Sequence, residues 1–224
     1  MSKSIIPWIA TDRVTSLLKE LYADAAIKDP LARASASGIK PTGDDIPVFF
    51  KSMRKAYMAV GWEFGKLLYS LARTTHAKTI VEFGTSFGVS TIFLAAALRD
   101  NGGGKLITTE YDAEKSEQAR RNLAATGLEE WVDFRVGDAR ESLTDSPDQI
   151  DMLFLDGAKE LYIEVLKLLE PRFRSGSVIA SDNTDHDGME SFLAYIQNPA
   201  NGYISSAILT SGERGKAHEI SIRH

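Results

Sequence analysis

The chain has 224 residues, a length that suits one sizeable α/β domain and is short for two. Its formal net charge of −5 and the absence of any Lys/Arg block argue against nucleic acid as its main partner. Without cysteine it cannot form a disulfide, a zinc–thiolate site or a cysteine nucleophile. The N-terminal apolar run is too short for a signal peptide and no stretch reaches membrane-spanning length, so we expect a cytoplasmic protein that does not bind a membrane.

The first third of the chain is expected to hold two helices separated by a loop. Apolar residues recur at helical spacing over 11–28 and predict the first helix. Three prolines and two glycines in 29–47 indicate a loop that could cover a site. A second helix is expected over 48–73, with a break near Val60 and Gly61 because glycine disfavours the helix interior.

From residue 79 onward, strand and helix patterns alternate. The expected parallel strands are 79–83, 105–110, 131–136, 151–155 and 177–181, and the helices are 89–99, 112–125, 138–144 and 160–171. Such alternation builds right-handed βαβ units and a parallel sheet. After a helix at 188–197, strands at 203–209 and 217–222 should pair as an antiparallel hairpin at one edge. The predicted fold is α/β and Rossmann-like, with a seven-stranded sheet, helices on both faces and an N-terminal helical cap.

The segment 80–91 predicts a buried strand, a glycine turn and a helix start. Gly84 and Gly88 let the backbone approach a ligand closely. The spacing is E-x-G-x-x-x-G, whereas the dinucleotide fingerprint is G-x-G-x-x-G. One glycine of the phosphate cradle is therefore missing, and Glu82 stands at the strand end. A carboxylate there repels phosphate and suits a cofactor with an amine and a sulfonium, which indicates S-adenosylmethionine instead of NAD.

Two further strand ends carry acidic residues. Glu110 ends the second strand, where it could accept hydrogen bonds from ribose hydroxyls. Asp138 follows the third strand and could accept from an adenine amino group, with Ala139 offering its backbone amide. Glu110 or Asp138 alone could instead be a helix N-cap, and that alternative stays open. Three acidic ends on three consecutive strands favour a cofactor site.

The remaining strand ends carry a candidate metal site. Asp156 ends the fourth strand, and Asp182 and Asn183 follow the fifth. These strands are neighbours in a right-handed βαβ unit, so the three side chains can converge. Their oxygens are hard ligands, which suit Mg²⁺ (or Ca²⁺ or Mn²⁺) and leave room for two vicinal hydroxyl oxygens. The alternative for Asp182 and Asn183 is an Asx-type turn, which leaves Asp156 unexplained.

With these motifs in this order, the chain resembles the class I S-adenosylmethionine-dependent methyltransferases, and more specifically the metal-dependent catechol and caffeoyl-CoA O-methyltransferases. The resemblance covers about residues 56–222. It is carried by M-A-V-G-W-E-F-G at 58–65, V-E-F-G-T-S-F-G-V-S-T at 81–91, T-T-E-Y at 108–111, V-G-D-A at 136–139, M-L-F-L-D-G-A-K at 152–159 and S-D-N at 181–183. It implies that the cofactor contacts Val60, Glu82, Gly84, Ser90, Glu110, Asp138, Ala139 and Asp156.

The same resemblance implies that Lys159 is the general base; the alternative is a solvated lysine at a helix start. Gly157 and Ala158 stand where the mammalian catechol enzymes have a bulky His-Trp pair. The wall for an aromatic acceptor must then come from elsewhere. The candidates are Trp8, Met58, Trp62 and Tyr162, each of which could equally be a core residue.

We therefore expect one methyltransferase domain over 1–224, with a cap region of 1–55 and a catalytic core of 56–224. The expected activity is Mg²⁺-dependent methylation of a hydroxyl on a small catechol-like or phenolic acceptor. One alternative is a metal-independent methyltransferase acting on a sugar, amine or carboxylate of a natural product. Another is a protein that binds S-adenosylmethionine without turnover; an NAD(P)-dependent reductase has little support. The hairpin edge and the N-terminal helices could serve a homodimer, although no sequence feature demands one.

Overall fold

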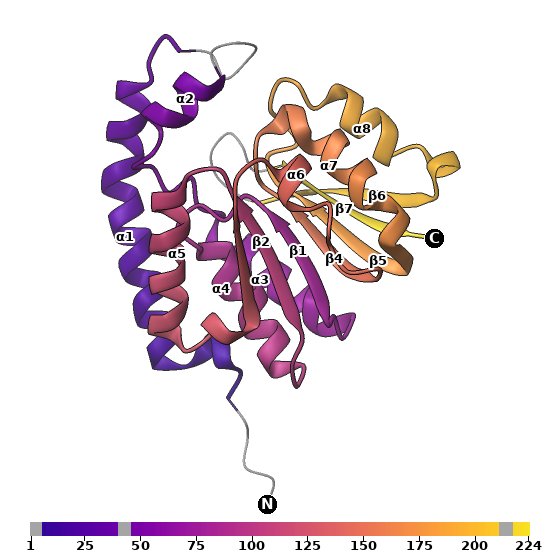
Figure 1. The fold of residues 1–224 in the computed structure, drawn as a ribbon, viewed down its shortest axis with the longest axis horizontal. Coiled ribbons are helices and arrows are strands. Elements are labelled where there is room, and N and C mark those ends of the chain that lie inside the picture. Colours follow the sequence, from indigo (N-terminus) through magenta and orange to yellow (C-terminus); the bar gives the residue numbers. More distant parts are fainter. Residues whose placement is uncertain (1–5, 40–45, 211–216) are drawn as a thin grey trace, which may run out of the picture.

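The computed structural model describes residues 6–39, 46–210 and 217–224, and it contains a seven-stranded sheet (Figure 1). The strand order is β3-β2-β1-β4-β5-β7-β6. The strands are β1 (Thr79–Phe83), β2 (Lys105–Glu110), β3 (Val132–Val136), β4 (Ile150–Leu155), β5 (Phe173–Ser181), β6 (Tyr203–Leu209) and β7 (Ala217–Arg223). The first five are parallel, and β7 pairs antiparallel with both β5 and β6. The predicted Rossmann-like sheet with a C-terminal hairpin is confirmed.

Helices cover both faces of this sheet. They are α1 (Asp12–Ser35), α2 (Ile46–Ser52), α3 (Trp62–Thr74), α4 (Val89–Asp100), α5 (Ala113–Thr126), α6 (Ala139–Ser142), α7 (Tyr162–Leu169) and α8 (Glu190–Ile196). Helices α3, α4 and α5 pack with α1 on one face, while α6, α7 and α8 lie on the other (Figure 1). In the described residues, none of these helices is both long and apolar enough to cross a bilayer.

Alternate residues of the buried strands supply the two halves of the core. In β1, Ile80 faces the layer of α3 and α4, whereas Val81 faces the layer of α7. In β4, Met152 and Leu153 divide in the same way. Because side chains alternate along a strand, a strand covered on both faces must be apolar on both, which is the pattern that predicted these strands.

The N-terminal part differs from the prediction in two places. Residues 29–35 were expected in a loop, but they continue α1 through Pro30. Ala32, on the extra turn, is buried with Met53 and Ala56 in a small apolar cluster, and this packing outweighs the cost of the proline. Of the rest of the expected loop, residues 40–45 lie outside the described part of the chain.

The prediction of one helix over 48–73 is also wrong for the middle of that range. Helix α2 ends at Ser52 and α3 begins at Trp62, so residues 53–61, here called the pocket loop, connect them without regular helix. The break expected near Val60 and Gly61 does coincide with the start of α3, whose N-cap is Gly61. The backbone of the pocket loop hydrogen-bonds to side chains from α1 and α5, which replaces the bonds that a helix would have made.

Candidate active site

The glycine turn joins β1 to α4 at the carboxyl edge of the sheet. Gly84 has φ +105°, and a Cβ there would lie 2.6 Å from the carbonyl oxygen of Asp156, so only glycine fits. Gly88 is the N-cap of α4 with φ +83°. The turn therefore brings bare backbone against the end of β4, where the sequence places a candidate ligand.

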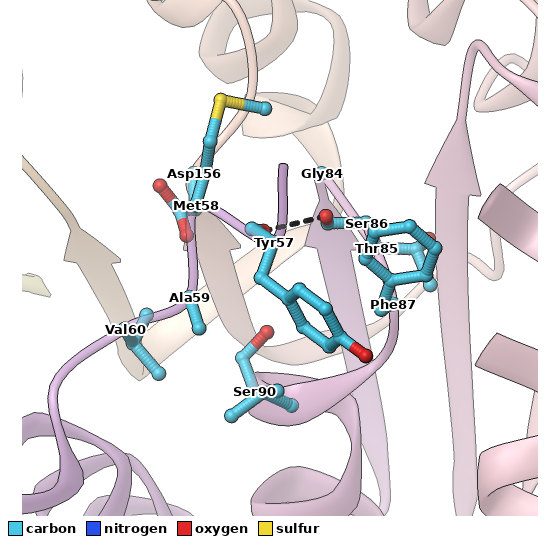
Figure 2. A pocket seen from close by; sticks show the side chains of 11 residues that line it. Tyr57, Met58, Ala59, Val60, Gly84, Thr85, Ser86, Phe87, Ser90 and Asp156 are labelled. Carbon is cyan, nitrogen blue, oxygen red and sulfur yellow. Dashed lines mark hydrogen bonds between the residues drawn. The ribbon is translucent and has the colours of Figure 1, made fainter. Parts of the chain in front are cut away.

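A pocket opens beside this turn (Figure 2). Four of the expected cofactor residues line it, namely Val60, Gly84, Ser90 and Asp156. Figure 2 shows Met58, Ala59 and Val60 on one side and Thr85, Ser86 and Phe87 on the other. The free volume inside it is about 10 Å³, room for roughly one water molecule and far below the usual range for ligand pockets of roughly 300–1,000 Å³, so a whole nucleoside cofactor requires it to widen.

Glu82 lies behind the turn and not in the pocket lining. It is fully buried, and its carboxylate accepts hydrogen bonds from Ser90 (2.6 Å), Thr91 (2.7 Å) and Thr108 (2.6 Å). Burial raises its pKa to about 7 despite these three hydroxyl donors. In this arrangement Glu82 fixes the first turn of α4, so its influence on a ligand passes through Ser90.

The side chain of Glu110, at the end of β2, binds backbone amides of the glycine turn and of the segment after β2. Its two carboxylate oxygens accept from the amide of Ser86 (2.8 Å) and the amide of Asp112 (3.0 Å). Ser86 has φ +45°, a backbone conformation that residues other than glycine seldom adopt, and the hydrogen bond from its amide to Glu110 stabilises it. The carboxylate thus lies next to the pocket wall, although it is not itself among the lining residues.

Asp138 and Ala139 follow β3 and start α6. Asp138 is the N-cap of this helix: it accepts from the amide of Arg140 at 2.9 Å and binds the Arg140 guanidinium at 2.6 Å. These contacts with Arg140 lower the pKa of Asp138. Ala139 is buried in the core. The helix-cap alternative therefore describes Asp138 in this structure, and neither residue lines the pocket.

The three candidate metal ligands come from neighbouring strand ends. Leu155 pairs with Ser181 across β4 and β5, and the amide of Asp182 donates to the Leu155 carbonyl at 2.9 Å. This register places Asp156 beside Asp182, with Asn183 following at φ +53°. Burial, and then the negative charge of Asp182, raises the pKa of Asp156 well above its usual range.

The chemistry of this donor set fits a hard divalent cation. The buried carboxylate of Asp182 and the half-buried carboxylate of Asp156 repel each other, and a cation between them would relieve that repulsion. Across the described residues no group of three or more His, Cys, Asp and Glu side chains is arranged to hold a metal ion. The expected ligand set contains only two such side chains, Asp156 and Asp182, because its third member, Asn183, is an amide. It therefore does not belong to that kind of group.

Lys159 lies at the edge of the same cluster. Its Nζ donates to the hydroxyl of Tyr162 at 2.6 Å and is 3.4 Å from a carboxylate oxygen of Asp156. The Lys159 side chain is 15% exposed, so it is accessible to a ligand while most of its surface is shielded from solvent. The structure therefore brings Lys159, Asp156 and Asp182 together.

His218 also contacts this cluster, although no sequence motif indicates that it should. His218 on β7 is 3% exposed, stacks on Phe64 with ring centroids 3.6 Å apart, and places Nδ1 2.6 Å from an oxygen of Asp182. His218 follows Asp182 by 36 positions and reaches it only because β7 inserts next to β5. Predicting this contact would have required knowing that β7 of the C-terminal hairpin pairs with β5.

Of the four candidates for the acceptor wall, only Met58 lines the pocket. Trp62 packs on Tyr22 and Phe93, and Tyr162 is fully buried. Trp8 donates its indole hydrogen to Thr126. Core or helix packing thus accounts for Trp8, Trp62 and Tyr162.

The small residue at position 157 also has a structural cause. A Cβ on Gly157 would collide with the ring of Phe83. Phe83 thus occupies the space that a larger residue at 157 would need.

A sheet of this order, with a glycine turn after β1 and acidic residues at the adjoining strand ends, defines the class of Rossmann-like methyltransferases. The family described as "Methyltransferase domain" matches residues 81–184. Catechol O-methyltransferase B of Danio rerio is 30% identical over 83% of this chain and 69% of its own length. The chain belongs to this family, the S-adenosylmethionine-dependent O-methyltransferases of the catechol type.

Two further similarities agree with this placement. The catechol O-methyltransferase of Niastella koreensis is 38% identical over 55% of this chain, and the chain spans only 57% of that protein's length. Among solved structures, the O-methyltransferase TomG of Streptomyces achromogenes, in complex with SAM, has a TM-score of 0.67 and 25% identity. That similarity covers 91% of this chain and 98% of the TomG chain.

Proposed function

We propose that this protein transfers the methyl group of S-adenosylmethionine to a hydroxyl of a small acceptor with vicinal oxygens, catechol-like or phenolic, in a Mg²⁺-dependent reaction. The observation that carries the proposal is that Asp182 and Lys159 converge on Asp156, which lines the glycine-turn pocket. The relatives named catechol O-methyltransferase support the choice of acceptor class.

In this proposal the glycine turn receives the cofactor. Gly84 offers backbone without a side chain, and Val60, Ser90 and Asp156 line the pocket around it. Glu110 fixes the turn through the amide of Ser86, and in this proposal it also accepts from a ribose hydroxyl. Asp138 would have to give up contacts with Arg140 to bind an adenine amino group.

Asp156, Asp182 and Asn183 would hold Mg²⁺, which when bound supplies positive charge that acidifies and orients an acceptor hydroxyl. Lys159 takes the proton of that hydroxyl at Nζ. The acceptor oxygen then displaces the methyl group in line, so that a carbon–oxygen bond forms as the carbon–sulfur bond breaks and S-adenosylhomocysteine leaves. Tyr162 keeps Lys159 within reach of the hydroxyl.

One observation favours a metal-independent methyltransferase as the second candidate. Asp182 already faces His218 at 2.6 Å, and the same oxygen accepts from the amide of Asn183 at 2.9 Å. These partners would give Asp182 a purely structural role. The acceptor of this second candidate would be a sugar, amine or carboxylate of a natural product.

The two candidates differ in their response to chelation. S-Adenosylmethionine labelled in its methyl group is incubated with a panel of catechols, flavonoids, amino phenols, sugars and amines, in EDTA and again after excess Mg²⁺ is added. We expect methylated product from acceptors with vicinal hydroxyls, and only with Mg²⁺. Product formation that is equal in EDTA would support the second candidate. Cofactor binding without any product would support a protein that binds without turnover.

A further inference from the structure

The pocket loop is held in place by side chains from outside it. Asp29, on α1, accepts from the amides of two consecutive residues, Tyr57 at 2.6 Å and Met58 at 3.0 Å. Lys115, on α5, donates to the carbonyl of Ala56 at 2.9 Å. Of these contacts, only those of Asp29 fix two consecutive peptide groups, Ala56–Tyr57 and Tyr57–Met58.

The glycine turn adds a further contact to this loop. The hydroxyl of Ser86 donates to the carbonyl of Tyr57 at 2.6 Å, which Figure 2 marks with a dashed line. The loop is therefore tied directly to the turn that forms the opposite side of the pocket.

Met58 has an unusual backbone conformation, with φ +48°. A methionine in this left-handed region is strained, so the surrounding contacts must hold it there. Met58, Ala59 and Val60 follow in the chain and line the pocket. The hydroxyl of Tyr22 donates to the carbonyl of Val60 at 2.9 Å and holds that end of the wall. If the amide of Met58 were released, Met58 and Ala59 would relax and their part of the wall would move.

We propose that Asp29 is a positioning residue for the cofactor: by accepting from the amides of Tyr57 and Met58, it keeps Met58 left-handed and keeps Met58 and Ala59, which line the pocket, where the cofactor needs them. This inference rests on the proposed function, since it assumes that the pocket binds S-adenosylmethionine. Asp29 lies on α1, outside residues 81–184 that match the methyltransferase family, so the family pattern does not supply it.

The chain offers a matched control on the same helix. Asp24 lies five residues earlier and also contacts Tyr57, but through the phenol hydroxyl at 2.7 Å and not through the backbone. Asp24→Asn removes the negative charge of a carboxylate on α1 beside Tyr57 and leaves both amides bound to Asp29. It therefore separates the backbone effect from the loss of an α1 carboxylate near the loop.

The test measures the dissociation constant of S-adenosylhomocysteine by calorimetry for Asp29→Ala, Asp29→Asn and Asp24→Asn. If the bound loop conformation falls to about a tenth of the population, binding to Asp29→Ala weakens about tenfold, with Asp29→Asn between it and the wild type. Asp24→Asn should stay within about twofold of the wild type, as for a surface substitution. Thermal unfolding without ligand identifies any variant that does not fold, and Asp29→Asn then replaces Asp29→Ala.

A rescue separates positioning from stability. Glycine adopts a left-handed φ without strain, so Met58→Gly in the Asp29→Ala background should recover most of the lost affinity, although it makes no new contact to α1. The inference is overturned if Asp29→Ala binds as tightly as the wild type, or if Asp24→Asn loses as much as Asp29→Ala, or if Met58→Gly restores nothing. A wild-type protein that binds no S-adenosylhomocysteine would overturn the proposed function, and this inference with it.

Discussion

The ammonium group of Lys159 lies 2.6 Å from the hydroxyl oxygen of Tyr162. That hydroxyl donates in turn to the carbonyl of Leu155 at 2.8 Å, the last residue of β4. Tyr162 is fully buried, with edge contacts to Phe83 and Phe192, so its hydroxyl has a fixed position. Through it the flexible side chain of Lys159 is anchored to the same strand end that carries Asp156.

Removing this anchor should impair turnover but not cofactor binding. In Tyr162→Phe, the Leu155 carbonyl keeps the amide of Asp182 as a partner, while the Asp182 carbonyl loses the hydroxyl that donates to it at 3.2 Å; thermal unfolding checks that the variant folds. Lys159 loses its hydrogen-bond acceptor, and we expect kcat to fall about tenfold, or about 1.4 kcal/mol of activation free energy. Steady-state kinetics measure kcat, and calorimetry with S-adenosylhomocysteine measures binding. A variant with unchanged kcat would show that Tyr162 is only a core residue.

Replacing the base itself should have a larger effect. Lys159→Met removes the ammonium group and keeps most of the apolar stem, and loss of general-base catalysis lowers kcat by about 10²- to 10⁴-fold. The dissociation constant of S-adenosylhomocysteine should change little, because Lys159 is not among the pocket-lining residues. Lys167→Met, on the exposed side of α7, is the matched control and should keep wild-type turnover. Full turnover in Lys159→Met would disprove the base assignment.

Glu82 should make the stability of the protein dependent on pH. Its pKa is about 7 in the folded state and 4.5 ordinarily, so the folded state binds this proton more tightly than the unfolded state does. The free energy of unfolding therefore falls as pH rises from 4.5 to 7, by about 3 kcal/mol for this one group. Glu82→Gln cannot titrate and should lack that component. Urea denaturation of both proteins across this range tests the point, and parallel stability curves would contradict it.

Glu110 should act on cofactor affinity through the turn. Glu110→Gln keeps one carbonyl oxygen but cannot accept from both the Ser86 and Asp112 amides, and it also loses a charge that ribose hydroxyls could bind. We expect S-adenosylhomocysteine to bind at least about tenfold more weakly, which equals about 1.4 kcal/mol. Glu114→Gln, an exposed acid on α5, serves as the control and should bind normally. Equal affinity in the two variants would exclude Glu110 from the cofactor site.

Most of the fold could be predicted from local patterns. The strands covered on both faces, such as β1 and β4, are short apolar runs bounded by turns, and their limits were found within a few residues. The hairpin of β6 and β7 was likewise visible as two strand patterns without a helix between them. The path of α1 through Pro30 and the irregular pocket loop were missed, because each depends on tertiary contacts that no local pattern encodes.

The candidate site divides in the same way. Asp156, Asp182 and Lys159 converge because strand ends meet at one edge of a parallel sheet, a rule that needs only the order of the strands. Asp29 and His218 could not be anticipated. Each contacts the site from a distant part of the chain, and neither stands in a recognisable motif.

The most direct test of the account follows methyl transfer as Mg²⁺ is added back to metal-stripped protein, with wild type and Asp182→Asn measured in parallel on a catechol acceptor. Asp182→Asn preserves size but removes one of the two carboxylates beside the pocket. We predict that the wild-type rate rises from near zero and saturates with Mg²⁺, while Asp182→Asn requires far more Mg²⁺ and stays slow. A wild-type rate that does not depend on Mg²⁺, and that Asp182→Asn shares, would contradict the proposed metal site.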